Sequence, residues 1–425
     1  MNIQELYQFY QKSYKVSTDT RKIAKDSIFF ALKGDNFNGN LFAEEALIKG
    51  ASYAIVDDKK YNKHPKTILV KDALKTLQSL ATYHREKLGI PIIGLTGSNG
   101  KTTTKELINA VLSTGFKTVA TTGNLNNHIG VPLTILSMTP ETEIGIVEMG
   151  ANHLKEIELL CNIALPDYGY ITNFGKAHLE GFGSVKGVIQ GKTELYQHLK
   201  NHNKKVFVNA NDIIQIDNSK NIDSVKFGSS NAEILVDLIE ANPFVILKFN
   251  SLTIRSKLIG VYNFNNIAAA IAIGNYFKIS AENIKEGIEN YVPANNRSQI
   301  VRIGSNAVIL DAYNANPTSM LAALSNLSSL SDLSKVAILG DMFELGKDSI
   351  IEHQNIVDLI TEFKFKNTFL IGENFFKTTS KNTNIQFFRT FEEFKSHFSK
   401  LKFENETLLI KASRGMALER IIDLL

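Results

Sequence analysis

The chain has 425 residues, of which 44% are hydrophobic and 21% are charged, values typical of a globular protein with more than one domain. Its formal net charge of +4 is small for this length and comes mostly from dispersed lysines, which argues against a nucleic-acid-binding surface. The one cysteine, Cys161, excludes an internal disulfide framework. The N-terminus lacks the apolar core of a signal peptide and no apolar run is long enough for a membrane span, so a cytoplasmic protein without membrane insertion is predicted.

Residues 1–88 have the pattern of a small α/β unit. Strand-like apolar runs at residues 27–32 and 54–56 flank a helical pattern over residues 42–49. A later helical pattern ends at Gly89, and Pro91 then begins a new strand, which predicts the first domain boundary.

The second predicted domain, residues 89–294, alternates strands with helices. Its predicted strands cover residues 92–95, 117–120, 144–148, 169–172 and 206–209. This alternation predicts a mainly parallel sheet with helices on its faces. Residues 225–260 break the alternation with closely spaced β-rich runs, and a helix is expected over residues 263–277.

The third predicted domain, residues 295–425, follows a polar break at residues 293–296. Its predicted strands cover residues 307–310, 336–339, 368–371 and 407–410, each followed by a helical pattern. Leucines repeat every three residues at positions 324, 327, 330 and 333, which predicts one buried helix face. We expect a Rossmann-like, doubly wound sheet, but no Gly-x-Gly-x-x-Gly loop is present to support a nicotinamide or flavin cofactor.

The most informative stretch is a glycine loop between an apolar strand and a helix. Its candidate nucleotide-binding residues are Gly97, Ser98, Asn99, Gly100, Lys101, Thr102 and Thr103. In such a loop backbone N–H groups and the helix N-terminus face a phosphate, the lysine adds a positive charge, and the first threonine can bind Mg²⁺. The usual pattern has glycine where this chain has Leu95, so the loop indicates phosphate binding without fixing the NTPase family. The alternative is a plain turn with a solvated lysine.

Further polar residues follow predicted strands at the sheet edge where ligands bind in open α/β sheets. Asn126 and Asn127 lie in an asparagine-rich loop, which fits either Asx-turns or a site for a substrate carboxylate or phosphate. Glu148 ends an apolar strand, a position suited to holding Mg²⁺ near a triphosphate. Taken alone, His178 is more simply a hydrogen-bonded loop histidine and Lys192 a solvated helix lysine.

In the third domain, residues 311–317 and 411–415 follow two predicted strands. Asn316 precedes Pro317 and is a good helix start, so part of the first run is helix capping. Arg414 lies where a strand turns into a helix, which suits either an anion site or a surface salt bridge. No catalytic Ser/His/Asp triad or zinc spacing is present. The pattern favours phosphoryl transfer to an acceptor, with a separate domain able to close over the nucleotide.

Three runs resemble the Mur ligase family of ATP-dependent amide-bond-forming enzymes, and the likeness covers essentially the whole chain in three domains. They are Thr-Gly-Ser-Asn-Gly-Lys-Thr-Thr (96–103), Gly-Asn-Leu-Asn-Asn-x-Ile-Gly-Val-Pro (123–132) and Asp-x-Tyr-Asn-Ala-Asn-Pro (311–317). The last two resemble the family member that adds D-alanyl-D-alanine to UDP-N-acetylmuramoyl-tripeptide. The resemblance implies those two substrates with ATP, an acyl-phosphate intermediate and peptidoglycan precursor synthesis; a monomer is expected.

The resemblance also implies roles for single residues. Lys101, His178 and Lys192 become the predicted catalytic residues. Thr102, Glu148 and His178 become magnesium ligands, and a carbamate on Lys192 would serve a second Mg²⁺. Nucleotide contacts are implied for Asn263, Asn266, Arg297 and Asp311; substrate contacts are implied for Thr20, Arg21, Asn126, Asn127, Tyr313, Asn314, Asn316, Lys411 and Arg414. Two positions depart from the family pattern: Tyr262 stands where histidine is frequent, and residues 38–42 differ from the usual first-domain motif.

Other readings stay open at this point. One is another Mur-type ligase that adds a single amino acid to a muramyl or folate-like acceptor. A second is a nucleotide-binding module without catalysis. A third, a P-loop motor or GTPase acting on a macromolecule, has little support from the modest charge of the chain.

Overall fold

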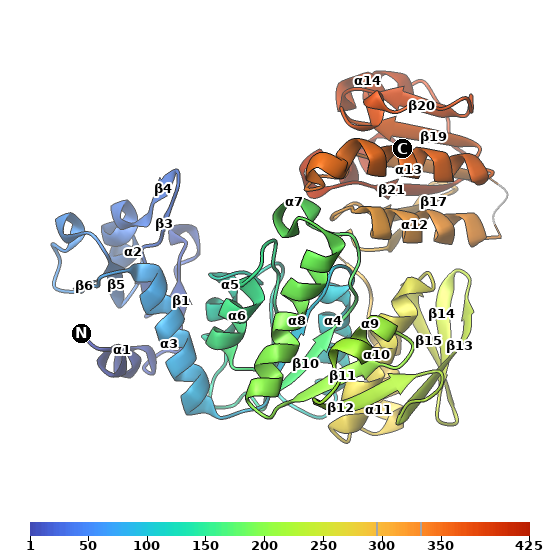
Figure 1. Ribbon diagram of the computed structural model, residues 1–425. Coiled ribbons are helices and arrows are strands. Elements are labelled where there is room, and N and C mark those ends of the chain that lie inside the picture. Colours follow the sequence, from blue (N-terminus) through green and yellow to red (C-terminus); the bar gives the residue numbers. More distant parts are fainter. Residues whose placement is uncertain (295, 332–333) are drawn as a thin grey trace.

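The computed structural model describes residues 1–294, 296–331 and 334–425. Three parallel-dominated sheets follow one another along the chain, as Figure 1 shows in blue, green to yellow, and orange to red. The predicted α/β class is confirmed. Asn295 in the predicted polar break and Leu333 in the leucine repeat lie outside the described residues. Within the described part, no helix is both long and apolar enough to cross a membrane.

The N-terminal sheet is fully parallel and has the strand order β1-β2-β5-β6. Its strands are β1 (Val16–Ser17), β2 (Ile28–Phe30), β5 (Tyr53–Val56) and β6 (Thr67–Leu69); β3 (Lys33–Gly34) and β4 (Phe37–Asn38) form a separate small hairpin. Ile28 and Phe30 pack towards α1 (Ile3–Tyr10) and α3 (Ala73–Leu88), whereas Phe29 on the other face packs towards α2 (Ala43–Ile48). Gly89 ends α3 in the left-handed conformation (φ 64°), as its sequence position predicts.

The central sheet has nine strands in the order β15-β14-β13-β12-β11-β10-β7-β9-β8. The strands are β7 (Ile92–Thr96), β8 (Thr118–Ala120), β9 (Ile144–Glu148), β10 (Tyr168–Ile171), β11 (Lys205–Asn209), β12 (Asp223–Gly228), β13 (Ile234–Ala241), β14 (Phe244–Phe249) and β15 (Leu252–Ile259). Neighbours from β8 to β13 pair in parallel, and β13, β14 and β15 pair antiparallel. The predicted β-rich break is therefore an antiparallel extension of the parallel sheet.

Helices cover both faces of the central sheet, which explains why its strands are continuous apolar runs. On one face Ile93 and Leu95 pack with α4 (Lys101–Leu112), α10 (Tyr262–Tyr276) and α11 (Ala281–Asn290). On the other face Ile92 packs with α5 (Gly130–Ile135), α6 (Glu156–Ala164) and α8 (Val185–Asn201). Two further helices in this part of the chain, α7 (Leu179–Phe182) and α9 (Ile213–Asn218), are short.

The C-terminal sheet has the order β16-β17-β21-β18-β19-β20, parallel except for the edge strand β16. Its strands are β16 (Gln299–Ile303), β17 (Asn306–Asp311), β18 (Lys335–Gly340), β19 (Asn367–Ile371), β20 (Ile385–Phe388) and β21 (Thr407–Lys411). Helices α12 (Pro317–Ser329) and α13 (Ser349–Glu362) cover one face, and α14 (Phe391–Phe398) with a final 3₁₀ helix (Leu418–Leu424) covers the other. The predicted doubly wound sheet is confirmed.

The leucine repeat is a helix face for only part of its length. Leu324 and Leu327 are fully buried on α12, but the helix ends at Ser329. Leu330 is the C-cap residue with extended backbone and is still buried. The predicted helix was therefore too long, because apolar spacing continues past the point where the backbone turns.

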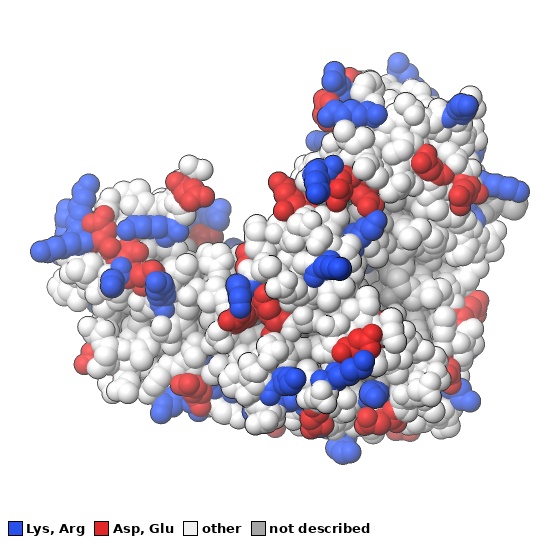
Figure 2. Space-filling view, in the orientation of Figure 1, with Lys and Arg blue, Asp and Glu red and all other residues white. Residues whose placement is uncertain are grey.

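Charge is distributed as the composition predicts. On the face in Figure 2, basic and acidic side chains are interspersed over all three parts of the molecule. This face is hollowed between the N-terminal and C-terminal parts (Figure 2).

Candidate active site

A cavity of about 650 Å³ lies between the central and C-terminal sheets. It opens at the carboxyl ends of β7, β9 and β10, which are neighbouring strands of the central sheet. The C-terminal side of the cavity is built from residues that follow β17 and β21, which are also neighbours. The predicted residues that line it are Ser98, Asn99, Gly100, Lys101, Thr102, Thr103, Asn126, Asn127, Glu148, His178, Asn263, Asn266, Arg297, Asp311, Tyr313, Asn314, Asn316 and Lys411.

The phosphate loop requires its two glycines. Gly97 has φ 144° and Gly100 has φ 77°, both in the region that side chains rarely adopt. A Cβ on Gly97 would collide with Thr172, and one on Gly100 would come within 2.6 Å of the Asn266 amide oxygen. Gly100 is the N-cap of α4 and offers no capping side chain. The first N–H groups of this helix therefore remain available to an anion.

Lys101 folds back over its own loop. Its Nζ donates to the carbonyl oxygens of Gly97 at 2.7 Å and Ser98 at 3.2 Å. Burial lowers the pKa of Lys101, Glu148 opposes that shift, and Arg297 adds to it. The ammonium is thus held at the mouth of the loop, next to the charges of Glu148 and Arg297.

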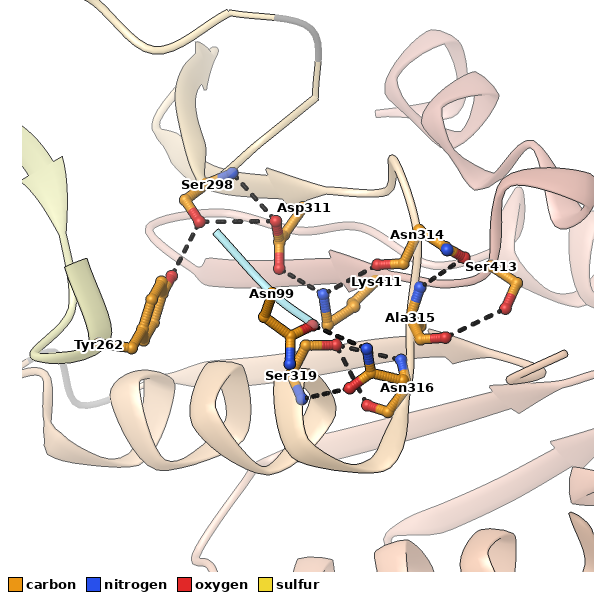
Figure 3. A network of polar contacts seen from close by, with 10 residues as sticks. All are labelled: Asn99, Tyr262, Ser298, Asp311, Asn314, Ala315, Asn316, Ser319, Lys411 and Ser413. Carbon is orange, nitrogen blue, oxygen red and sulfur yellow. Dashed lines mark hydrogen bonds and ion pairs between the residues drawn. The ribbon is translucent and has the colours of Figure 1, made fainter. Parts of the chain in front are cut away.

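Asn99 connects the phosphate loop to both sheets. Its backbone N–H donates to the Asn173 side chain at 3.1 Å, and its carbonyl accepts from Asn173 Nδ2 at 2.9 Å and Thr172 Oγ1 at 2.6 Å. Its side-chain oxygen accepts from Asn316 Nδ2 of the C-terminal domain at 2.7 Å. Figure 3 shows these two asparagines facing one another across the domain junction.

Asn316 also caps α12, and substitution separates its two roles. Its side chain accepts from Ser319 N at 2.9 Å in a capping box. We expect Asn316→Ser to keep the cap but lose the reach to Asn99, and Asn316→Ala to lose both. In urea titrations, the free energy of unfolding of Asn316→Ala should therefore be about 1 kcal/mol lower than that of Asn316→Ser. Equal unfolding free energies for the two variants would contradict the capping role.

Glu148 ends β9 with one oxygen fixed and one free. Oε1 accepts from Asn126 Nδ2 at 2.8 Å, and the backbone N–H of Glu148 donates to Thr121 Oγ1 at 3.0 Å. Oε2 is buried and has no hydrogen-bond partner. A buried, unpartnered carboxylate oxygen calls for a cation or a donor from a bound molecule. Among the described residues, no three His, Cys, Asp or Glu side chains converge into a complete metal site.

His178 lies in the loop after β10, where it meets the C-terminal domain. Its Nδ1 is 2.6 Å from Glu344 Oε2, and this contact lowers the pKa of Glu344. Two residues earlier, Lys176 Nζ lies 2.6 Å from Glu352 Oε1, and the Lys176 N–H donates to Thr318 Oγ1 at 2.9 Å. This loop therefore forms a polar junction between the two domains.

Lys192 is fully buried on α8 and is not among the residues that line the cavity. Its Nζ donates to the Ala151 carbonyl at 3.1 Å and lies 5.0 Å from the centre of the Phe182 ring. Burial, and then the charge of Lys101, lower the pKa of Lys192 well below its ordinary value of 10.5. The amine is consequently shifted towards its neutral, nucleophilic form. The simpler interpretation, in which Lys192 is a solvated helix lysine, is therefore wrong.

Lys192→Met is expected to stabilise the protein while it removes the amine. A base whose pKa is depressed on folding binds its proton more tightly in the unfolded chain, so it destabilises the fold below its ordinary pKa of 10.5. We therefore expect Lys192→Met to have the higher unfolding free energy at neutral pH, with the difference narrowing as pH rises towards that value. Urea unfolding in buffer freed of CO₂, so that no carbamate forms, measures this. A lower unfolding free energy for Lys192→Met than for the wild type would contradict a depressed pKa for Lys192.

Asn263 and Asn266 line the cavity from the start of α10, but their amides make contacts within the protein. Asn266 Oδ1 accepts from Thr104 Oγ1 at 3.0 Å, and Asn266 Nδ2 donates to Asn263 Oδ1 at 2.8 Å. Asn263 Nδ2 donates to the Ile259 carbonyl at 2.8 Å. The pair thus holds the helix that follows the phosphate loop. Their predicted contact with adenine stays a prediction.

A polar chain joins α10 to the C-terminal sheet (Figure 3). Tyr262 and Ser298 hydroxyls lie 2.8 Å apart, Asp311 Oδ1 accepts from Ser298 N at 3.1 Å, and Asp311 Oδ2 lies 2.5 Å from Lys411 Nζ. Lys411 also donates to the Asn314 carbonyl at 3.2 Å. Tyr262, which departs from the family pattern, therefore makes a direct contact across the domain junction.

Arg297 has its guanidinium 3.6 Å from the centre of the Tyr313 ring, a cation–π stack at the cavity wall. Its Nε is buried without a hydrogen-bond partner. Asn127 behaves as the simpler reading expects, because its side-chain oxygen accepts from Ile129 N and Gly130 N at the start of α5. Its predicted substrate contact is untested.

Three predicted substrate residues lie outside this cavity. Arg414 is largely exposed and pairs with Glu419 at 2.8 Å, the surface salt bridge of the simpler reading. Thr20 and Arg21 belong to the N-terminal domain, where Arg21 pairs with Asp19 at 2.8 Å. A site that joins them to the cavity would need a substrate long enough to reach the N-terminal domain.

The structure adds residues that had no predicted role. Asn173 lies two residues after the end of β10, so the rule that ligands gather at strand ends could have found it. Ser298 and Glu344 carried no local signal, because each meets its partner only after distant segments come together.

Comparison with known proteins defines the class. A family model described as the Mur ligase middle domain matches residues 95–274, and one described as the Mur ligase glutamate ligase domain matches residues 296–414. The chain belongs to the Mur ligase family. It is similar to the UDP-N-acetylmuramoyl-tripeptide–D-alanyl-D-alanine ligases of Bacillus subtilis and Escherichia coli, at 35% and 31% identity respectively. Each comparison covers 96% of this chain and 92% of the relative.

Two solved structures have the same architecture over nearly the whole chain. MurF from Acinetobacter baumannii is 30% identical, with a TM-score of 0.87 over 96% of this chain and 93% of that one. MurF ligase from Thermotoga maritima, solved in complex with ADP, is 25% identical, with a TM-score of 0.84 and 96% of both chains covered.

Proposed function

We propose that this chain is an ATP-dependent, ADP-forming ligase that joins D-alanyl-D-alanine to UDP-N-acetylmuramoyl-tripeptide, a cytoplasmic step of peptidoglycan precursor synthesis. The observation that carries the proposal is the cavity in which a glycine loop, a buried carboxylate and polar residues of the C-terminal domain face one space. The relatives named above supply the identity of the two substrates. We also propose that the enzyme acts as a monomer.

The nucleotide would bind across the domain junction. The N–H groups at the start of α4 and the Lys101 ammonium would hold the terminal phosphates. Arg297, with its unpartnered Nε, can add a second cation near them. Asp311 would face the ribose while Ser298 and Lys411 hold its carboxylate in place.

The chemistry needs an activated acid, because a free carboxylate is a poor electrophile. A carboxylate oxygen of the tripeptide attacks the γ-phosphorus, the bond to the β,γ-bridging oxygen breaks, and ADP leaves. The amine of D-alanyl-D-alanine then attacks the acyl carbon of the resulting acyl phosphate. The tetrahedral intermediate loses a proton from nitrogen, and its C–O bond to phosphate breaks. Lys101 would stabilise charge on the transferred phosphoryl group, and closure of the C-terminal domain would exclude water.

The residues present fit a magnesium site beside the phosphates. Glu148 offers a buried, unpartnered oxygen, and Thr102 and His178 line the same cavity. Mg²⁺ typically takes one or two protein ligands and completes its shell with substrate phosphates and water, so an incomplete protein site is expected. The ion, when bound, neutralises charge on the phosphates.

Lys192 fits a carbamate. Its depressed pKa favours the neutral amine, which can add to CO₂ and release a proton to give an anionic group with two oxygens. That group would offer ligands to a second Mg²⁺. Its present contact with the Ala151 carbonyl would be replaced on modification.

We also propose that the chain divides into domains at residues 1–88, 89–294 and 295–425. Each range contains one of the three main sheets. The first would bind the UDP part of the substrate through Thr20 and Arg21, the second would bind ATP, and the third would close over the nucleotide. The distance of Thr20 and Arg21 from the cavity suits a long substrate whose ends are bound separately.

The test is ADP release by the purified chain with ATP, Mg²⁺ and UDP-N-acetylmuramoyl-tripeptide, with and without D-alanyl-D-alanine. We expect ADP and a pentapeptide product only when the dipeptide is present. Release with a single amino acid and a different muramyl or folate-like acceptor would instead assign another ligase of this family. ATP binding without turnover under all conditions would identify a non-catalytic nucleotide-binding protein.

A further inference from the structure

Lys105 is a buried lysine that the proposed chemistry does not use. It lies on α4, one turn after Lys101, is 3% exposed and is not among the residues lining the cavity. Its Nζ donates to the Thr121 carbonyl at 2.6 Å, and the nearest carboxylate oxygen, from Glu106, is 3.6 Å away. Burial of an ammonium group costs solvation free energy, which its hydrogen bonds and ion pairs must offset. An apolar side chain of similar length could fill the same space.

The partner of Lys105 is part of a chain of contacts that ends at Glu148. Thr121 directly follows β8, and its Oγ1 accepts from the Glu148 N–H at 3.0 Å. Five residues later, Asn126 Nδ2 donates to Glu148 Oε1 at 2.8 Å. The Asn126 carbonyl accepts from Gly150 N at 2.8 Å. The loop from Thr121 to Asn126 is therefore fastened at both ends around Glu148.

These contacts decide which Glu148 oxygen is free. Asn126 occupies Oε1, so Oε2 is the buried oxygen that remains without a partner. If the loop moved away, the carboxylate could rotate and its free oxygen would no longer have one fixed direction. Among the described residues, Lys105 is the only side chain that donates to the Thr121 carbonyl.

We propose that Lys105 is a positioning residue: it anchors the loop at Thr121 so that Asn126 orients Glu148 to bind the Mg²⁺ that accompanies the nucleotide. The inference rests on the proposed function for the presence of Mg·nucleotide, and it assigns Lys105 no contact with substrate. Residues that orient a metal ligand commonly change metal affinity by about 10- to 100-fold when they are replaced.

The experiment is calorimetric titration of the full chain with ADP, once with Mg²⁺ and once with EDTA. We expect Lys105→Met to bind Mg·ADP about tenfold more weakly than the wild type and to bind ADP in EDTA equally well. The matched control is Lys117→Met, because Lys117 immediately precedes β8 and its side chain is 70% exposed. This control should bind like the wild type in both buffers.

Two results would overturn the inference: Mg·ADP affinity unchanged in Lys105→Met, or affinity reduced equally with and without Mg²⁺, which would place the effect on the phosphate loop. If Lys105→Met does not fold, Asn126→Ser at the other end of the loop must show the same Mg²⁺-specific loss. Because the measurement needs no turnover, a chain that fails the ligation assay can still show the Mg²⁺-specific difference. The two proposals therefore fail separately.

Discussion

Lys101→Met is expected to lower kcat for ADP release by about 10³-fold, the scale found when a group that stabilises transition-state charge is removed. Lys101 is the lysine held at the mouth of the phosphate loop, 2.7 Å from the Gly97 carbonyl. Charge on the phosphoryl group changes as it passes between ADP and the tripeptide, so the ammonium should matter more in the transition state than in the bound substrates. A fall in kcat with a smaller change in KM for ATP is therefore predicted.

Steady-state ADP release with both substrates saturating measures this effect. Lys117→Met provides the same chemical change on an exposed side chain and should keep wild-type rates. The unfolding transition of Lys101→Met should also be recorded, since the Gly97 and Ser98 carbonyls lose a donor. A folded Lys101→Met with wild-type kcat would show that the loop does not bind the reacting phosphates.

The order and type of the elements could be predicted because local patterns decide them. Ile144–Glu148 is a strand at the predicted residues, since it is an apolar run with polar residues at its ends. The helix end at Gly89 could be predicted because glycine readily adopts the left-handed conformation that ends α3. The error at Leu330 arose where apolar spacing continued beyond the end of α12.

The convergence of the site could also be predicted, but its contacts could not. Parallel strands bring their carboxyl ends to one edge, so Asn99, Glu148 and His178 had to lie close together. The Asn99–Asn316 bond joins residues 217 positions apart, and no local pattern specifies such a pairing. Which asparagine orients a carboxylate and which only caps a turn depends on side-chain direction. Asn126 does the first and Asn127 the second.

Burial distinguished the simple from the functional reading for the basic residues. From the sequence alone, Lys192 could also be a solvated helix lysine and Arg414 part of a surface salt bridge. The first is fully buried with a depressed pKa, whereas the second pairs with Glu419 five residues away in solvent. Helical spacing places Lys192 on the same face of α8 as Val188 and Leu195, which are buried. The spacing does not specify its contacts with Phe182 and Ala151, which form only when α8 packs.

Glu148→Gln is expected to reduce kcat/KM by at least about 10²-fold, because a metal near a transferring phosphoryl group supplies several kcal/mol of charge stabilisation. The substitution keeps the size of the side chain and an oxygen for Asn126, but it removes the negative charge and turns the buried, unpartnered Oε2 into an amide nitrogen. An amide that donates cannot bind a cation through that atom. The variant should therefore need a higher Mg²⁺ concentration for half-maximal activity.

Measuring ADP release over a range of Mg²⁺ concentrations separates this effect from general damage to the site. Glu143→Gln is the matched control, since Glu143 lies just before β9, at the opposite end of the same strand from Glu148. Its side chain is exposed and accepts from Lys117 N at 2.7 Å. The control should follow the wild-type curve. If Glu148→Gln also followed it, the free oxygen of Glu148 would not be a metal ligand, and the carboxylate would serve only to hold the asparagine loop.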